Sequence, residues 1–502
     1  MISTLPDWVS HWAERFGDRT AIHFEGDSWS WRRLDTAVRE WTARLRDADV
    51  APGDRVAVLL LNRPEYFVVE WAAHRVGAVV VPVNVRLAPR ELDDVLLDAE
   101  PAVVVYEQAP ALGSLTEHLQ ATFRGVAIDV DAPGPESQAD QSAVPRTVDE
   151  PAALLYTSGT TGRPKGVLLT VGNLEASARM WGVEFALDYR DTHLVCMPLC
   201  FAGGFIASSK QVIASGGTMV LLREFEPETA LHAIERHRIT WIISVPLILQ
   251  RMRDSEGWNG TDLSSLRGIQ SGGATVPREL IKDYNRRGVE ISQAYGLSEG
   301  TSGPAMFLDA AHLLDKLGSV GRPTWGHAVR LLDPDDQDVS PGEIGEIAIK
   351  SPLVFAGYWR QPDSTEAAFV GDWLKTGDLA RQDEDGFYFI EGRSKEMIVT
   401  GGLNVYPAEV ELVVREFDGI ADVAVVGLPS ADWGEEVVAC VLPEEGADLS
   451  ETEVIAFARE RLAGYKTPKR VVVVDEFPLT MSSKIQRVAL RQQLIIDMEE
   501  SA

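Results

Sequence analysis

Along most of the chain, short runs of β-branched residues alternate with longer amphipathic stretches. The run RVAVLLL at residues 55–61 is followed by an amphipathic stretch at 64–77 and by two more apolar runs at 78–85 and 102–107. Continuous apolar runs of this length are typical of parallel strands that are buried on both faces. The pattern therefore predicts βαβ units and largely parallel sheets.

A second series of the same kind begins after a polar, proline-containing segment at residues 132–146 and includes HLVCMPL, GTMVLL, ITWIISV and LRGIQSGG. Two series predict two stacked α/β subdomains. Short strands punctuated by Gly and Pro then indicate a small β-rich subdomain, and the last part of the chain reads as a compact α+β domain. The predicted division is an N-terminal domain at 1–394, with subdomains at about 1–150, 151–317 and 318–394, and a C-terminal domain at 395–502.

Length and composition narrow the class of protein. The 502 residues exceed the usual size of one domain, and 45% hydrophobic with 25% charged residues is ordinary for a globular protein. A formal net charge of -29 opposes extended contact with nucleic acid or an anionic membrane. The N-terminus lacks a basic region followed by an apolar stretch, and no run is long enough to cross a bilayer. We expect a cytoplasmic protein with no nucleic-acid partner and no stable membrane insertion.

The strongest chemical signal is YTSGTTGRPKG at residues 156–166, directly after an apolar run. Its glycines allow a tight loop, its hydroxyls can donate hydrogen bonds, and its lysine adds a mobile positive charge, so the loop is suited to a triphosphate. The GxxxxGK[ST] spacing of a Walker loop is absent. The loop residues expected to bind phosphate are Thr157, Ser158, Gly159, Thr160, Thr161, Gly162 and Lys165.

This string resembles the phosphate loop of the adenylate-forming superfamily, which comprises acyl-CoA synthetases, adenylation domains and luciferases. Motifs similar to the rest of the family's set follow in its order: SGGATVP (271–277), QAYGLSEG (293–300), KTGD (375–378), GRSKEMIVTGGLNVYPAEVE (392–411) and PLTMSSKIQR (478–487). They span nearly the whole chain. The resemblance implies an α/β fold with a large N-terminal domain, made of two stacked α/β subdomains and a small β-rich one, and a mobile α+β C-terminal domain.

The resemblance also implies an AMP-forming acyl-CoA ligase. Such an enzyme uses ATP and Mg²⁺ to convert a carboxylic acid into an acyl-adenylate and then passes the acyl group to coenzyme A. Because a carboxylate is a poor electrophile, catalysis depends on positioning and charge neutralisation. By resemblance, Lys484 bridges the substrate carboxylate and the α-phosphate, Glu299 and Thr160 hold Mg²⁺, and Asp378 accepts the ribose hydroxyls. Further nucleotide-binding residues implied are Gly273, Ala274, Gln293, Ala294, Tyr295, Gly296, Ser298 and Arg393.

For the second half-reaction the family rotates its C-terminal domain about one hinge residue. Lys395 resembles that hinge, and Gly401 with Gly402 resembles the loop that admits the pantetheine arm, where missing side chains permit close approach of the thiol. Coenzyme A is the expected acceptor, and an acyl carrier protein is the alternative. A homodimer is also compatible with the sequence.

The predicted acyl pocket is lined by apolar or small residues, namely Phe201, Ala202, Gly203, Val245 and Gly272. This favours a hydrophobic monocarboxylic acid. Two departures from the family stand out: Phe201 replaces a histidine found in many acyl- and aryl-CoA synthetases, and Ser483 replaces the glycine before Lys484. They motivate a second hypothesis, in which the protein catalyses thioesterification only and receives acyl-adenylate made elsewhere.

Three other classes of function fit less well. Residues 296–300 match the GxSxG elbow of α/β-hydrolases, but only His312 and His327 follow Ser298, which leaves too little chain for the rest of a triad. A binding protein with a degenerate nucleotide site would be expected to lack Lys484, Asp378 or Glu299, and all three are present. An amino-acid adenylating enzyme usually places an aspartate after the MPL turn, where this chain has no carboxylate.

Overall fold

The computed structural model describes residues 4–134, 139–157, 164–400, 403–430, 433–462, 464–479 and 485–500, and the contacts divide the chain into two compact units. Unit 1 comprises Met1–Val329 and Ile349–Leu374, and unit 2 comprises Arg330–Ala348 and Lys375–Ala502. The predicted β-rich region is therefore shared between the two units. The predicted boundary after residue 394 separates a C-terminal domain expected to move as a body, and it stays a prediction.

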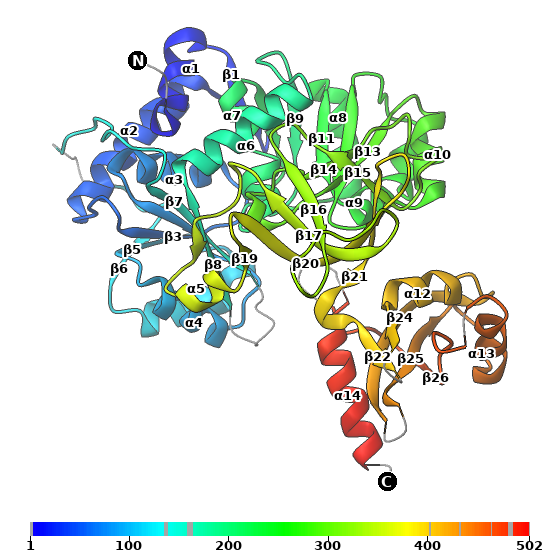
Figure 1. The fold of residues 1–502 in the computed structure, drawn as a ribbon. Coiled ribbons are helices and arrows are strands. Elements are labelled where there is room, and N and C mark those ends of the chain that lie inside the picture. The colour runs from blue at the N-terminus through cyan, green and yellow to red at the C-terminus, as the bar shows by residue number, and fades with distance from the viewer. Residues whose placement is uncertain are drawn as a thin grey trace. The chain divides into compact units, whose positions relative to one another are not determined.

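The first sheet of unit 1 follows the order β18-β8-β7-β4-β3-β5-β6. Its inner strands pair in parallel, as the buried apolar runs predict. Helices α4 and α5 pack on one face, and α3, buried along nearly its whole length, contacts β3 and β4 (Figure 1). The elements are α3 (Pro64–Val76), α4 (Pro89–Ala99), α5 (Gly113–Thr122), β3 (Arg55–Leu59), β4 (Val79–Pro82), β5 (Val103–Tyr106), β6 (Val126–Asp129), β7 (Pro151–Thr157), β8 (Lys165–Thr170) and β18 (Gly357–Tyr358).

The second sheet of unit 1 follows the order β15-β14-β13-β12-β11-β9-β10-β1-β2. Strands β9 to β13 pair in parallel with one another, and β13 pairs antiparallel with β14, so a second, largely parallel sheet is present as expected. The strands are β1 (Thr20–Phe24), β2 (Asp27–Ser30), β9 (Thr192–Val195), β10 (Thr218–Leu221), β11 (Trp241–Ser244), β12 (Gly268–Gly272), β13 (Ile291–Tyr295), β14 (Met306–Leu308) and β15 (Ser319–Pro323). The helices are α1 (Trp8–Phe16), α2 (Trp31–Asp47), α6 (Val171–Glu184), α7 (Lys210–Ser215), α8 (Pro227–His237), α9 (Pro246–Arg253) and α10 (Arg278–Arg286).

Unit 2 contains the neighbouring strands β16 (Ala328–Leu332), β17 (Ile344–Lys350), β20 (Trp373–Gln382) and β21 (Tyr388–Arg393), of which the first three begin or end in unit 1. A separate sheet has the order β23-β22-β25-β24, with β26 paired to β25. Alternate residues of β24 and β25 face α12 and α13 on one side and α14 on the other (Figure 1). The elements are β22 (Ile398–Thr400), β23 (Leu403–Val405), β24 (Ile420–Ser430), β25 (Gly434–Pro443), β26 (Arg470–Val473), α12 (Pro407–Val414), α13 (Glu451–Arg459) and α14 (Arg487–Glu500).

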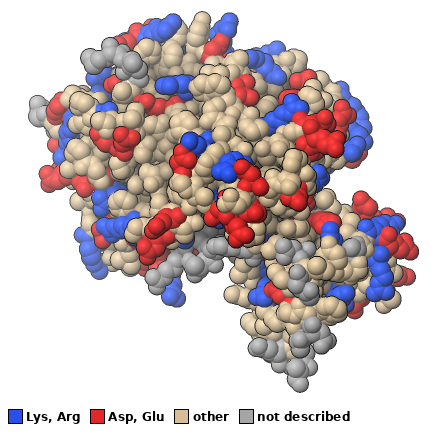
Figure 2. Space-filling model, in the orientation of Figure 1, with Lys and Arg blue, Asp and Glu red and all other residues tan. Residues whose placement is uncertain are grey.

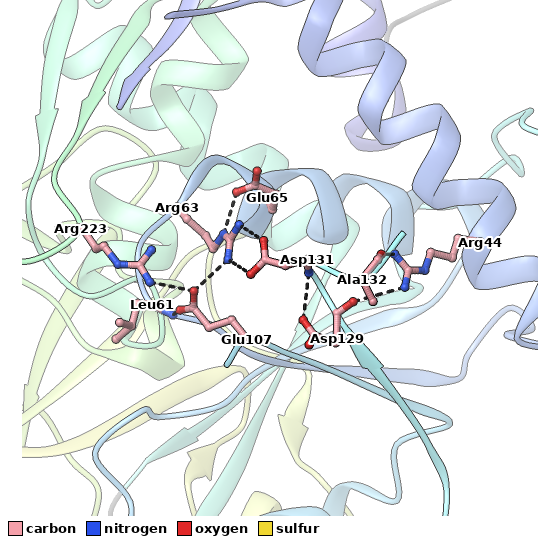
Figure 3. A network of polar contacts seen from close by, with 9 residues as sticks. All are labelled: Arg44, Leu61, Arg63, Glu65, Glu107, Asp129, Asp131, Ala132 and Arg223. Carbon is pink, nitrogen blue, oxygen red and sulfur yellow. Dashed lines mark hydrogen bonds and ion pairs between the residues drawn. The ribbon is translucent and has the colours of Figure 1, made fainter. Parts of the chain in front are cut away.

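A network of ion pairs lies at the carboxyl ends of the strands in unit 1 (Figure 3). Glu107, which follows β5, is buried and accepts a hydrogen bond of 2.5 Å from the backbone N–H of Leu61. Arg63 binds it at 2.9 Å, and so does Arg223, which follows β10 of the second sheet. Because the carboxylate is out of water and charge-paired on both sides, it ties the two sheets together.

Charged side chains cover much of the surface of unit 1. Figure 2 shows acidic and basic side chains interspersed with uncharged ones over the face in view. Within the described ranges, none of the helices is both long enough and apolar enough to span a membrane.

Candidate functional site

The predicted phosphate loop connects β7 to β8. Thr157 ends β7 and pairs in register with Lys165 at the start of β8, and the Thr157 hydroxyl donates to the Lys165 carbonyl at 3.5 Å. The antiparallel pairing therefore closes the base of the loop. The remaining predicted loop residues, Ser158, Gly159, Thr160, Thr161 and Gly162, lie outside the described residues.

Lys165 and Glu299 both contact one tyrosine, Tyr358. The hydroxyl of Tyr358 donates a hydrogen bond of 2.9 Å to Oε1 of Glu299, and the Lys165 Nζ lies 4.9 Å from the centre of the Tyr358 ring. Lys165 also donates to the hydroxyl of Ser364 at 3.3 Å. Tyr358 is in β18, which pairs with β8, the strand that begins at Lys165. Sequence reasoning missed Tyr358 and Ser364, because no motif marks them.

The surroundings of Glu299 fit a magnesium ligand. It is half-buried in the short 3-10 turn Ser298–Gly300, where its backbone carbonyl accepts a hydrogen bond of 2.8 Å from Phe355. Among the described residues, no lysine or arginine is ion-paired with its carboxylate, and no group of three or more His, Cys, Asp or Glu residues could form a metal site. Mg²⁺ commonly takes one or two carboxylates and relies on substrate phosphates for further ligands. A single carboxylate with no ion-pair partner among the described residues, in contact with the same tyrosine as Lys165, suits that mode.

The predicted adenine-binding segments follow two paired strands, β12 and β13, with Gly272 opposite Ala294. Gly273 is exposed and has a φ of +79°, a conformation that side chains strongly disfavour. Gln293 is buried: its amide oxygen accepts from the Val276 N–H at 2.9 Å and its amide nitrogen donates to the Ser319 carbonyl at 2.8 Å. These bonds engage the amide with the protein and shape the segment after β12. Ala274 is exposed; Tyr295 and Ser298 are half-buried, and Gly296 is exposed.

In unit 2, Asp378 and Arg393 form a pair across the hairpin of β20 and β21. They are opposite each other in register, and the Arg393 Nε lies 2.5 Å from Oδ1 of Asp378. Asp378 is 6% exposed, and its backbone N–H donates to the hydroxyl of Thr376 at 3.2 Å. The ion pair with Arg393 orients the buried carboxylate. The hairpin register brings these two predicted nucleotide-binding residues together.

The hinge and the C-terminal motifs are described only in part. Lys395 has its backbone in the 3-10 turn Ser394–Glu396; its side chain lies outside the described residues, as do Gly401, Gly402 and Lys484. Arg487, three residues after Lys484, binds Glu411 of α12 at 2.8 Å and Glu396 at 3.4 Å. Arg487 therefore ties the segment after the predicted catalytic lysine to the turn that contains the predicted hinge.

A cavity of about 160 Å³ lies in unit 2, lined by Thr400, Leu403, Trp433, Gly464, Tyr465 and Lys469. Thr400 and Leu403 flank the predicted Gly401-Gly402 loop in the chain. The Lys469 Nζ lies 5.7 Å from the centre of the Trp433 ring, so the cavity combines apolar aromatic walls with one cation.

The predicted acyl-pocket residues lie in unit 1 on segments that follow β9, β11 and β12. Phe201, Ala202 and Gly203 are half-buried and lead into the π-helical turn η3 (Gly203–Ala207). Val245 packs against a core cluster that includes Met180, Trp181, Phe185, Met197 and Ile243. A Cβ on Gly273 would lie 3.8 Å from Cγ1 of Val245, so this part of the predicted pocket adjoins the predicted adenine segment.

Comparison with known proteins agrees with this geometry. Residues 9–359 match the family described as AMP-binding enzyme, and residues 409–484 match the AMP-binding enzyme C-terminal domain. The chain is 37% identical over 490 residues to a feruloyl-CoA synthase of an Amycolatopsis species, covering 97% of this chain and 99% of that protein. It is 36% identical over 509 residues to an indoleacetate–CoA ligase of Aromatoleum aromaticum, covering 97% and 98%.

Among solved structures, the o-succinylbenzoate CoA synthetase of Bacillus subtilis in complex with its acyl-adenylate intermediate is similar to this chain. The TM-score is 0.87 at 30% identity, and the match covers 98% of this chain and 99% of that one. The same synthetase in complex with ATP and magnesium ion gives a TM-score of 0.86 at 30% identity over 96% and 99% of the two chains.

Proposed function

Because the chain belongs to the AMP-binding enzyme family and is an AMP-forming acyl-CoA ligase that uses ATP and CoA, we propose that its substrate is a hydrophobic monocarboxylic acid. The observation that carries this proposal is the apolar lining of the predicted pocket. Phe201, Ala202 and Gly203 bear no polar side-chain group, and Val245 packs in a cluster rich in aromatic and sulfur-containing side chains. Burial of apolar surface would supply most of the affinity, and the reacting carboxylate would supply the orientation.

Planar aromatic acids are the first class to test. The feruloyl-CoA synthase and the indoleacetate–CoA ligase are named for acids with an aromatic ring, and both match this chain over nearly its full length. Phe185, Trp181 and Trp241 lie in or against the cluster that includes Val245, and aromatic side chains pack favourably on flat rings. Phe201 then acts as an apolar wall at the position where many relatives carry histidine.

For the nucleotide we propose that Asp378 binds the ribose hydroxyls and that Lys165 with the phosphate loop binds the phosphates. Glu299 holds Mg²⁺, which would neutralise charge on the phosphate oxygens, and the Tyr358 hydroxyl orients that carboxylate. Lys484 neutralises charge where the acid carboxylate meets the α-phosphate. The solved complex of the related synthetase with ATP and magnesium ion supports the use of both by this chain.

For the second half-reaction we propose that the cavity lined by Thr400, Leu403 and Trp433 receives part of the CoA arm. Its aromatic walls would pack on the pantetheine chain, and Lys469 would face a phosphate group. Coenzyme A fits better than a carrier protein as acceptor, because the relatives are named as CoA ligases. A cytoplasmic location accords with the use of ATP and CoA, and a homodimer stays a prediction.

A panel of acids tests the substrate proposal. Initial rates of AMP release would be measured with ATP, Mg²⁺ and CoA for arylpropenoic, arylacetic, linear aliphatic and dicarboxylic acids, with wild type and Phe201→Ala. Hydrophobic monocarboxylic acids should give the highest kcat/KM, and Phe201→Ala should change the ranking among them. A preference for dicarboxylic acids, or a ranking that Phe201→Ala leaves unaltered, would refute the pocket assignment.

A further inference from the structure

Residues 201–203, three of the five predicted acyl-pocket residues, lie on one connection, residues 197–210, which leads from β9 into α7. This 197–210 segment contains the π-helical turn η3. π-Helical turns are rare, break the regular ladder of backbone hydrogen bonds and are frequent at functional sites. Such a turn needs partners for its carbonyl groups, so the groups around it show what holds its shape.

Three consecutive side chains at the end of the turn bind its carbonyls. The Ser208 hydroxyl donates to the carbonyl of Gly203 at 3.0 Å, and the Ser209 hydroxyl donates to that of Phe205 at 2.7 Å. The Lys210 ammonium also donates to the carbonyl of Phe205, at 2.5 Å. The turn is thus stabilised by its own following residues, and the last of them carries a charge.

Lys210 is a buried cation with a single carboxylate partner. Its side chain is 1% exposed and its Nζ lies 2.7 Å from Oε1 of Glu70 in α3, whose side chain is 0% exposed. The Nζ also lies 3.8 Å from the centre of the Phe205 ring. A buried ion pair adds little stability compared with apolar residues of the same volume, because desolvation offsets the attraction. Its effect here is to fix where Phe205 and its turn sit relative to α3.

Two further polar residues, near Glu70 in the chain, bind the start of the segment. Tyr66 is one helical turn before Glu70 in α3, on the same helix face, and Asn62 lies in the extended stretch just before α3 begins at Pro64. The Asn62 amide donates to the carbonyl of Met197 at 3.0 Å and accepts from the Leu199 N–H at 2.8 Å. The Tyr66 hydroxyl donates to the Leu199 carbonyl at 3.1 Å. Helix α3 and the residue just before its N-cap therefore bind both ends of the 197–210 segment.

Asn62 is itself held in place by the bonds that it and its neighbours make. Asn62 stands between Leu61 and Arg63, both of which bind the buried Glu107 in the network of Figure 3. Asn62 also donates to the carbonyl of Leu222 at 3.0 Å, so it touches the connection after β10 as well. Movement of Asn62 would require several charge-assisted hydrogen bonds to break together.

We propose that Asn62, Tyr66 and the Glu70–Lys210 pair are positioning residues that hold the 197–210 segment in the shape that receives the acid, and thereby set which acids are accepted. The proposal rests on the assignment of the acyl pocket to residues 201–203 made above. None of the four is required to touch the substrate. They act through the backbone of Leu199 and Phe205, which lie on either side of the pocket residues.

The test uses variants that remove single contacts while keeping volume. Tyr66→Phe removes only the hydroxyl bound to Leu199, and Glu70→Gln/Lys210→Met replaces both charges so that neither is left buried and unpaired. Asp191→Asn is the control: Asp191 is 2% exposed and binds Arg267 at 2.6 Å, but it precedes β9 at the end opposite to Met197. Melting temperature, KM for ATP, and kcat and KM for two acids of different size would be measured for each full-length protein, with Phe201→Ala in parallel.

We expect Tyr66→Phe to raise the KM for the acid about threefold to tenfold and the double variant to raise it about tenfold or more, as the loss of one or several hydrogen bonds predicts. The KM for ATP should stay within about twofold, and the ratio of kcat/KM for the two acids should change. Asp191→Asn should lower the melting temperature without altering the KM for the acid or the ratio of kcat/KM for the two acids. If the double variant fails to fold, the acid KM and the selectivity of Tyr66→Phe decide whether the proposal holds.

Unchanged acid KM and selectivity in Tyr66→Phe and the double variant, with an altered value in Phe201→Ala, would overturn the positioning role and leave the pocket assignment standing. Unchanged values in all three would overturn both. A loss of kcat that is equal for both acids, with KM unaltered, would assign these residues to stability alone and also overturn the proposal.

Discussion

The hydroxyl of Tyr358 donates a hydrogen bond of 2.9 Å to Oε1 of Glu299, and the residues come from different sheets of unit 1. A hydrogen bond to a metal-binding carboxylate fixes its orientation and tunes its basicity. Tyr358→Phe should therefore raise the Mg²⁺ concentration needed for half-maximal activity by about tenfold, in line with the effect of outer-shell partners, and leave the KM for the acid unaltered. A magnesium titration of acid-dependent pyrophosphate release measures this.

Tyr106→Phe is the matched control for that variant. This variant also removes a single tyrosine hydroxyl, which accepts a hydrogen bond of 2.9 Å from Gln120. Tyr106 lies in β5, which contributes no residue to the predicted site. Equal magnesium curves for wild type and Tyr358→Phe would contradict the role given to Glu299.

Asp378→Asn should weaken ATP binding, because the amide lacks the charge and one acceptor that the ribose hydroxyls would use. Hydrogen bonds to a charged group are worth about 1.5–3 kcal/mol, so the KM for ATP should rise roughly 10- to 100-fold. Glu391→Gln is the control, since Glu391 pairs with Arg381 at 2.8 Å on the same hairpin. A larger effect from the control would show that the hairpin, and not the carboxylate of Asp378, matters for ATP.

Gly204 and Gly182 should respond in opposite directions to alanine. A Cβ on Gly204 would lie 2.1 Å from the carbonyl oxygen of Pro198, whereas nothing lies within 4 Å of a Cβ on Gly182 in α6. Gly204→Ala should lower the free energy of unfolding by about 1–3 kcal/mol and disturb acid binding. Gly182→Ala should raise it by about 0.5–1 kcal/mol, as expected for a helix interior. Denaturant melts measure both, and destabilisation by Gly182→Ala alone would contradict the packing described.

His327 should make the protein less stable in acid. Burial lowers the pKa of its imidazole to about 4, while its Nδ1 shares a hydrogen bond of 2.9 Å with Thr324. The unfolded chain takes up this proton near the ordinary pKa of about 6.5, so the free energy of unfolding falls as pH drops from there towards 4. His327→Gln should remove about 3 kcal/mol of that fall. Unfolding curves at several pH values would show equal slopes for both proteins if the account were wrong.

The sequence predicts the parallel strands well because each is a continuous apolar run that has to be buried on both faces. The β24 and β25 pair is equally readable, since its alternate residues face two different sets of helices. No feature of the sequence near β1 indicates that this strand pairs with β10. The pairing places the first strands of the chain in the second sheet. Chain order alone suggested a subdomain at about 1–150, to which these strands would belong.

Within the candidate site, motif residues could be found from sequence and their supports could not. Asp378 and Glu299 stand in recognisable strings, whereas Tyr358 reaches Glu299 only because β18 pairs with β8. Asn62, Tyr66 and Glu70 can be read in the sequence, but buried polar residues in and just before a helix give no sign of which loop they contact. Lys484 and most of the phosphate loop lie outside the described residues, so their roles stay predictions.

The most direct test of the account is a coupled measurement of AMP and pyrophosphate release with ATP, Mg²⁺, CoA and a hydrophobic acid, for wild type and Lys484→Ala. Wild type should release both products only when acid is present and form the acyl-CoA, and Lys484→Ala should lose adenylation by about 10²–10³-fold, as for a principal electrostatic group. The contrary result is no release from any acid, together with acyl-CoA formation from supplied acyl-adenylate. That outcome would mean that thioesterification alone is native to this chain.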